Sequence, residues 1–161
     1  MEQLITPWAI PVAAVAALLI GSIWYNPKVF GNAWMRESGM TEEKMKGGNM
    51  AVIFGLALLF AAMLSIVLMQ FTNHQFGALG MIGGDPETAE ASFEAFMADY
   101  GTTFRTFKHG ALHGTMFGVL GALPIIGTIG LFERKSAKYI FINAGYWIVT
   151  LAVMGAILCG L

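Results

Sequence analysis

Three histidines carry the most concentrated titratable chemistry of this sequence. His109 and His113 are four residues apart, which places them on one face of a helix, and His74 follows an earlier apolar run. Imidazole nitrogens bind transition-metal ions and relay protons, so the group admits three interpretations: hydrogen-bonded packing, a metal site, or a path for protons or a small solute. A tight zinc site takes three or four protein ligands, and only His74 is an obvious third. We therefore expect His109 and His113 to point into a helix bundle, without a bound metal.

Other catalytic and cofactor signatures are absent from the sequence. It contains no nucleotide-binding glycine loop, no Cys-x-x-Cys pair and no His-Glu-x-x-His arrangement. Ser22 and Ser65 have no base near them in the sequence, and the single cysteine, Cys159, excludes an intrachain disulfide. The sequence thus predicts no catalytic residue, no cofactor and no enzymatic activity.

Helices in a nonaqueous solvent must position the histidines, because the chain is too apolar for water. Of its 161 residues 57% are hydrophobic and 12% are charged, whereas about 25% are charged in ordinary soluble domains. Four uncharged runs are long enough, at about 1.5 Å per residue, to cross a hydrocarbon core of roughly 30 Å as helices: 7–25, 50–72, 110–132 and 139–161. The prediction is an all-α, integral membrane four-helix bundle that forms one domain over 1–161. A net charge of −1 without a basic stretch argues against nucleic acid as a partner.

The first apolar run is interpreted as a retained helix rather than a signal peptide. Glu2 is the only charge before it, whereas a signal peptide has a basic segment there. Pro27 disfavours helical dihedrals at Asn26, so we expect the helix to end at this point. The connection 26–49 is then predicted to continue as an interfacial segment, within which Thr41 begins a short helix.

Lysine and arginine predict the orientation in the membrane. Seven of the nine basic residues lie in the connections 26–49 and 133–138. The connection 73–109 carries only Arg105 and Lys108, together with five acidic residues. By the positive-inside rule the first and third connections are cytoplasmic, and both termini are extracytoplasmic.

The connection 73–109 contains the pattern of an amphipathic helix. Between its acidic residues, Phe93, Phe96, Met97 and Tyr100 recur at spacings of three and four. This pattern predicts an extracytoplasmic amphipathic helix over 86–100, with these four side chains on one buried face. A position along the membrane interface and one over the mouth of the bundle both stay open.

Small residues form a stripe along the third apolar run. Gly110, Gly114 and Gly118 share one helix face, and small side chains let helix backbones approach closely in lipid. We interpret this stripe as a helix-packing face, either within the chain or between subunits. Pro124, further along the run, is expected to bend the helix.

A further motif lies where the first apolar run ends. The residues that carry it are Trp24, Tyr25, Asn26, Pro27, Phe30, Gly31 and Trp34. With His113-Gly114 and Gly145-Tyr146 in the third and fourth runs, this motif makes the chain similar to a family of small bacterial four-helix membrane proteins defined only as a domain of unknown function. The resemblance covers nearly the whole chain and implies the bacterial inner (cytoplasmic) membrane, but no activity, substrate or cofactor.

Three classes of function are compatible with these features. The first is a non-enzymatic structural or accessory membrane protein that self-associates or joins a larger membrane complex, in keeping with the glycine stripe. The alternative is a small oligomeric channel or transporter for protons, metal ions or a small solute, which would use the face formed by His109 and His113. An intramembrane enzyme has the least support. The expected partners are the lipid bilayer and another membrane protein, a second copy included.

Overall fold

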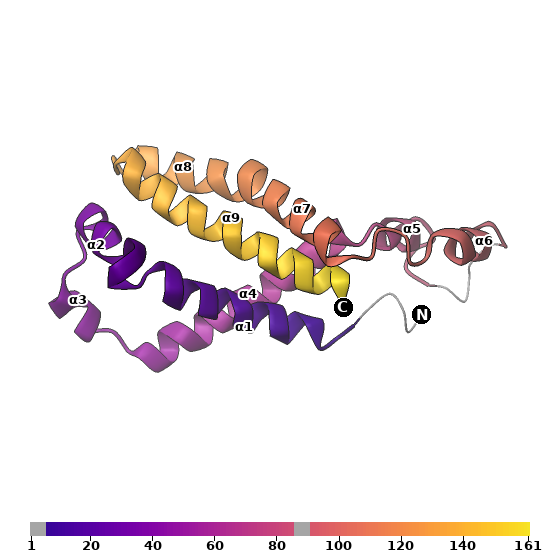
Figure 1. Ribbon diagram of the computed structural model, residues 1–161, viewed down its shortest axis with the longest axis horizontal. Coiled ribbons are helices and arrows are strands. Elements are labelled where there is room, and N and C mark those ends of the chain that lie inside the picture. Colours follow the sequence, from indigo (N-terminus) through magenta and orange to yellow (C-terminus); the bar gives the residue numbers. More distant parts are fainter. Residues whose placement is uncertain (1–5, 86–90) are drawn as a thin grey trace.

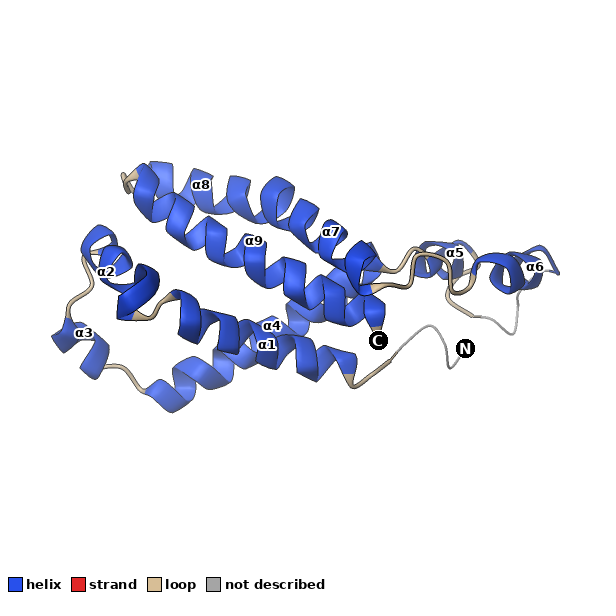
Figure 2. Ribbon diagram, in the orientation of Figure 1, coloured by secondary structure: helices blue, strands red, loops and turns tan. Residues whose placement is uncertain are grey.

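The computed structural model describes residues 6–85 and 91–161, and over these ranges its regular structure is helical, without strands (Figure 2). The longer helices are α1 (Ala9–Trp24), α4 (Met50–Thr72), α7 (Phe107–Phe117), α8 (Leu123–Phe132) and α9 (Ala137–Gly160). The connections contain α2 (Asn32–Ser38), α3 (Glu42–Lys46), α5 (Gln75–Met81) and α6 (Ala91–Tyr100). Two π-helical turns are η1 (Pro27–Gly31) and η3 (Gly118–Ala122). The predicted all-α class is confirmed.

Three helices in the described ranges are long and apolar enough to cross a membrane: Met50–Thr72, Phe107–Phe132 and Ala137–Gly160. The remaining expected span, 7–25, is shorter than predicted. Its helix α1 has 16 residues and reaches only roughly 24 Å. It attains the required length only together with Pro27–Ser38, which meets it at a bend of 49°. The described ranges therefore contain three unbroken candidate spans and a bent pair of helices in place of four straight spans.

The helix α9 is the centre of the arrangement. In Figure 1 it lies between α7 and α8 on one flank and α1 on the other, and α4 crosses near α1. The helices α1, α4, α7 and α8 all pack against α9, and α1 also packs against α4. The connection that contains α2 and α3 lies at the same end as the turn between α8 and α9 (Figure 1). At the opposite end lie α5, α6 and the C-terminus.

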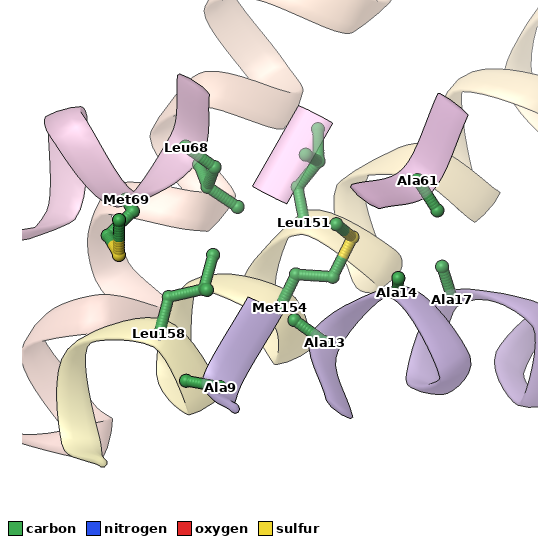
Figure 3. Packing of buried hydrophobic residues seen from close by; sticks show 10 residues of the cluster. All are labelled: Ala9, Ala13, Ala14, Ala17, Ala61, Leu68, Met69, Leu151, Met154 and Leu158. Carbon is green, nitrogen blue, oxygen red and sulfur yellow. The ribbon is translucent and has the colours of Figure 1, made fainter. Parts of the chain in front are cut away.

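The core joins α1, α4 and α9 through small and aliphatic side chains (Figure 3). Its members are Ala9, Ala13, Ala14, Ala17, Ala61, Leu68, Met69, Leu151, Met154 and Leu158. The α1 members are all alanines, spaced so that they share one face of the helix. Because an alanine side chain is a single methyl group, α1 can lie close to the larger Leu and Met side chains of its neighbours.

Polar side chains define where several helices begin and end. Thr41 Oγ1 accepts the Lys44 N–H and starts α3, as the sequence predicts. The extended dihedrals of Asn26 (φ −62°, ψ 140°) follow the end of α1. The predicted end of the first helix before Pro27 is therefore confirmed.

The span from α7 to α8 passes through a π-helical turn rather than breaking at Pro124. Pro124 has no N–H and cannot continue the regular hydrogen-bond pattern. Just before it, the Leu123 N–H bonds to the Gly118 carbonyl oxygen, five residues back, which widens η3 by one residue. The helical span Phe107–Phe132 stays continuous as a result.

The predicted amphipathic helix is present in part, but the prediction that one of its faces is buried is wrong. α6 covers Ala91–Tyr100, and residues 86–90 lie outside the described ranges. No residue of α6 is buried: Phe96 is 43% exposed and Tyr100 is 52% exposed. The α6 side chains are exposed because of the tertiary arrangement: α6 packs mainly against the short α5, beyond the end of the long helices (Figure 1).

Candidate functional site

The three histidines gather at the end of the bundle where α7 begins and α4 passes into α5. The Thr106 Oγ1 accepts the His109 N–H at 3.2 Å, and this cap places His109 and His113 in the first turns of α7. Extended dihedrals at Asn73 (φ −110°, ψ 100°) end α4 and turn the chain. His74 lies at that turn, directly before α5.

The three imidazole rings lie within contact distance of one another. The Nε2 atoms of His74 and His109 are 2.9 Å apart, which is a hydrogen bond in which one ring donates and the other accepts. The centroid of the His113 ring is 4.9 Å from that of His74 and 4.4 Å from that of His109. One nitrogen of each ring lies within 4.8 Å of the other two. The structure thus brings together two residues of one helix and a third from a distant part of the chain.

This histidine cluster lies at the edge of the bundle, not in its interior. His109 and His113 are half-buried, and His74 is exposed. The expectation that His109 and His113 point into the bundle is therefore wrong, although they do lie beside the end of the second apolar run. The inward face of α7 is occupied by Gly110 and Gly114, which are buried against α9. The histidines precede these glycines by one residue, and they are rotated away from α9 by about 100°.

Phe104, which no sequence pattern marks, covers the histidine cluster. Its ring stacks on His109, with centroids 5.0 Å apart and planes at 21°, and it meets His74 edge-on at 6.1 Å. The backbone of Phe104 has φ 65°, a left-handed conformation that is uncommon for a bulky residue. The Arg105 Nε donates to the Cys159 carbonyl oxygen at 3.3 Å, and the Cys159 thiol shares its one hydrogen between the carbonyl oxygens of Thr72 at 3.3 Å and Phe104 at 3.4 Å. These bonds to α9 hold the strained loop so that the Phe104 ring lies on His109.

A cavity of about 180 Å³ opens beside His74. The residues that line it are His74, Gln75, Phe96, Tyr100, Thr103 and Phe104. Gln75 is only 4% exposed, and its Nε2 donates to the carbonyl oxygens of Tyr100 and Thr103 at 2.8 and 2.9 Å. These two bonds define which amide atom is nitrogen, because a carbonyl oxygen can only accept. The Gln75 Oε1 has no hydrogen-bond partner within the described ranges.

The aromatic motif at the end of α1 lies at the opposite end of the bundle and packs against α9. The Trp24 ring covers Gly145, where an added Cβ would come within 3.0 Å of the Trp24 Cζ2. The Tyr25 hydroxyl donates to the Asn143 Oδ1 at 3.0 Å, and the rings of Tyr25 and Tyr146 are 5.3 Å apart. Two motifs that are remote in sequence, one on each helix, therefore meet here.

The rest of this motif shapes the turn that follows α1. Pro27 begins η1 and Gly31 ends it, and a Cβ on Gly31 would collide with the Tyr25 carbonyl oxygen. Trp34 meets the Tyr25 ring edge-on at 5.5 Å. Phe30 keeps 37% of its surface exposed, so the interfacial segment expected from the sequence is open to its surroundings there, whereas the Trp24 and Tyr25 side chains are half-buried against α9.

The glycine stripe of α7 and η3 faces α9 within the same chain. A Cβ added to Gly110, Gly114 or Gly118 would collide with α9. The nearest α9 residues are Gly155, Leu151 and Ile148, respectively. Gly155 is the reciprocal partner, since its own Cβ would collide with the Gly110 carbonyl oxygen. The contact is therefore intramolecular. Gly155, the partner residue on α9, is one of several glycines in an apolar run, so the sequence alone does not mark it.

Comparisons with known proteins give a family but no function. The family described as "Protein of unknown function (DUF1761)" matches residues 8–159. No curated protein and no solved structure matches the chain.

Proposed function

The chain belongs to the DUF1761 family of proteins of unknown function, and from its structure we propose that it is a non-enzymatic accessory protein of a bacterial inner membrane, which associates with another membrane protein or with a second copy of itself. Three continuous apolar helices support the membrane location. The family match covers residues 8–159, so the helices on which the proposal rests all belong to the family's domain.

The proposed orientation has both chain ends outside and the connections 26–49 and 133–138 in the cytoplasm. The uneven distribution of lysine and arginine is its main support. The helix arrangement agrees with it, because these two connections lie at the same end of the bundle and the histidine cluster at the other (Figure 1).

The exposed first half of α4 is the main support for the proposed association with another membrane protein or a second copy. From Met50 to Phe60 every residue is exposed except Ala57, which is half-buried. Leucine, isoleucine and phenylalanine side chains project here, whereas the buried residues of α4 all belong to its second half. Half of this candidate span is thus without a neighbouring helix from its own chain, which leaves room for a helix of another subunit.

One face of this exposed half suits close helix contact. Ala51 and Gly55 are four residues apart on the same face, and an added Cβ on Gly55 would meet nothing within 4 Å. Small residues at this spacing let two membrane helices approach closely. The glycine stripe of α7 does not serve this purpose, because α9 already covers it.

A channel or transporter has less support from the structure. The space between α1, α4 and α9 is filled by the alanine, leucine and methionine core, and the histidine cluster lies at one end only. A pathway would therefore have to form between subunits rather than through one chain.

Disulfide cross-linking tests the proposal directly. A cysteine at Gly55, in a Cys159→Ser background, is expected to link two copies on mild oxidation of native membranes, because the two Gly55 faces would approach closely. A cysteine at Leu120, which is 71% exposed on the side of the bundle that carries η3, is the matched control and should stay unlinked. If the Gly55 cysteine stays unlinked and native mass spectrometry of the parent shows a monomer without a protein partner, the proposed association is wrong.

A further inference from the structure

We propose that His74, His109 and His113 bind one divalent transition-metal ion of the zinc and copper class through three imidazole nitrogens. This site goes beyond the proposed accessory function and does not depend on it. It also differs from the expectation drawn from the sequence, in which a metal site was one of three interpretations and no bound metal was expected.

The positions of the donor atoms support a metal site. In a tetrahedral zinc site with Zn–N distances of about 2.0–2.1 Å, neighbouring nitrogens are roughly 3.4 Å apart. The two Nε2 atoms of His74 and His109 are 2.9 Å apart, and the three nitrogens all lie within 4.8 Å of one another. Small rotations of the exposed His74 and the half-buried His113 side chains would cover the difference with the backbone in place.

The chemistry of the donors selects the type of ion. All three ligands are neutral nitrogen donors, and the cluster includes no carboxylate from the described ranges. Calcium and magnesium prefer oxygen ligands, whereas imidazole suits zinc, copper and nickel. With three protein ligands, a fourth coordination position is open to water or to an exchangeable ligand.

Hydrogen bonding among the three rings does not explain the position of His113. The bond between His74 and His109 uses one nitrogen of each ring. His113 contacts both of these rings, but it makes no hydrogen bond to any residue that the structure describes. A metal ion would use the His113 nitrogen as well, and it would replace the hydrogen bond by two coordinate bonds.

The surroundings of the histidine cluster favour a defined site over a mobile group of side chains. Phe104 stacks on His109 and restricts the rotation of its ring. The cavity of about 180 Å³ beside His74 offers space for an exchangeable ligand at the open coordination position.

Metal stoichiometry is the primary test. The full-length protein, without a histidine tag, is stripped with a chelator in detergent and then dialysed against buffered Zn²⁺. Elemental analysis is expected to give one zinc per chain for the parent, and clearly less than one for His74→Asn, His109→Asn and His113→Asn. The matched control is Lys108→Gln, because Lys108 is an exposed neighbour of His109 on the same helix and contributes no ligand. Phe104→Ala should bind zinc more weakly than the parent, because His109 loses the ring that stacks on it.

A second measurement does not depend on the folding of the variants. The unaltered protein is loaded with one equivalent of Cu²⁺, and its electron paramagnetic resonance spectrum is expected to show hyperfine coupling to three imidazole nitrogens. The proposal is overturned if the parent binds no zinc saturably, if any single asparagine variant retains one zinc per chain, or if the copper spectrum lacks coupling to nitrogen.

Discussion

Close contact between α7 and α9 depends on residues without side chains. At Gly114 an added Cβ would collide with the Leu151 carbonyl oxygen and come within 3.0 Å of the Ala152 Cα. These atoms belong to the backbone, so they cannot move aside as the end of a flexible side chain can. Because membrane helices associate largely through close packing, the glycines determine how near the two backbones lie.

We predict that Gly114→Ala lowers the free energy of unfolding by roughly 1–3 kcal/mol, the usual cost of overpacking. Gly127→Ala is the matched control, because its Cβ would meet only the Ile140 Cγ2, at an ordinary 3.9 Å. In the control, replacing a helical glycine should stabilise the protein by about 0.5–1 kcal/mol. Reversible unfolding in mixed detergent measures both values. Equal stabilities for the two variants would show that α7 does not touch α9 at Gly114.

The hydrogen bond between Tyr25 and Asn143 gives a second prediction for a single residue. Tyr25→Phe keeps the ring packed against Trp34 and Tyr146 but removes the donor to the Asn143 Oδ1. We expect a loss of about 1 kcal/mol in the same unfolding measurement. Tyr139→Phe should have little effect, since the Tyr139 hydroxyl bonds to no residue in the described ranges. A neutral result for Tyr25→Phe would mean that water replaces the bond without cost.

At the scale of elements, α8 ends in a Schellman motif whose left-handed position is occupied by Arg134 rather than by glycine. The Lys135 N–H bonds to the Gly130 carbonyl oxygen at 2.8 Å, and the Arg134 N–H bonds to the Leu131 carbonyl oxygen at 3.1 Å. This pattern requires a left-handed residue between helix and turn, and Arg134 occupies that position with φ 55°. Glycine is the residue that adopts this conformation without steric cost.

Arg134→Gly is therefore predicted to stabilise the protein by roughly 0.5–1 kcal/mol. Glu133→Gly is the control, because Glu133 has φ −77° and gains nothing from the freedom of glycine. The measurement is the shift of the unfolding midpoint in detergent for both variants. A loss of stability in Arg134→Gly would indicate that the charge at this position matters more than its backbone conformation.

At the scale of the whole molecule, the two ends of the bundle differ in chemistry. One end carries the basic connections and the aromatic motif of α1 and α9, and the other carries α5, α6 and the histidine cluster (Figure 1). If the positive-inside rule holds, the histidines face the outside of the cell. A metal site there would exchange with the extracytoplasmic solution.

Cysteine labelling on intact cells tests this orientation. In a Cys159→Ser background, Glu94→Cys on the exposed face of α6 should react with a membrane-impermeant thiol reagent, whereas Lys44→Cys should react only after the cells are opened. Both positions are exposed, so a difference in reactivity reports the side of the membrane rather than burial. Labelling of Lys44→Cys on intact cells would reverse the proposed topology.

Local chemistry in the sequence predicts most of the helical elements. The uncharged run 50–72 coincides with α4, because a long apolar segment satisfies its backbone most readily as a helix. Asn26-Pro27 ends α1, and Thr41 begins α3, since both effects act between neighbouring residues. Even the spacing of His109 and His113 on one helix face follows from helix geometry alone.

The pairing of these elements is decided only by the tertiary structure. An apolar membrane helix presents similar surfaces all round, so its sequence does not say which face meets another helix and which meets lipid. For this reason the partner of the glycine stripe and the exposed first half of α4 could not be predicted. The exposure of α6 has another cause, since this helix packs mainly against the short α5. The sequence names His74 as the obvious third histidine, but the contact of its ring with His109 and Phe104 joins segments that are distant in sequence, and no local pattern determines such a contact.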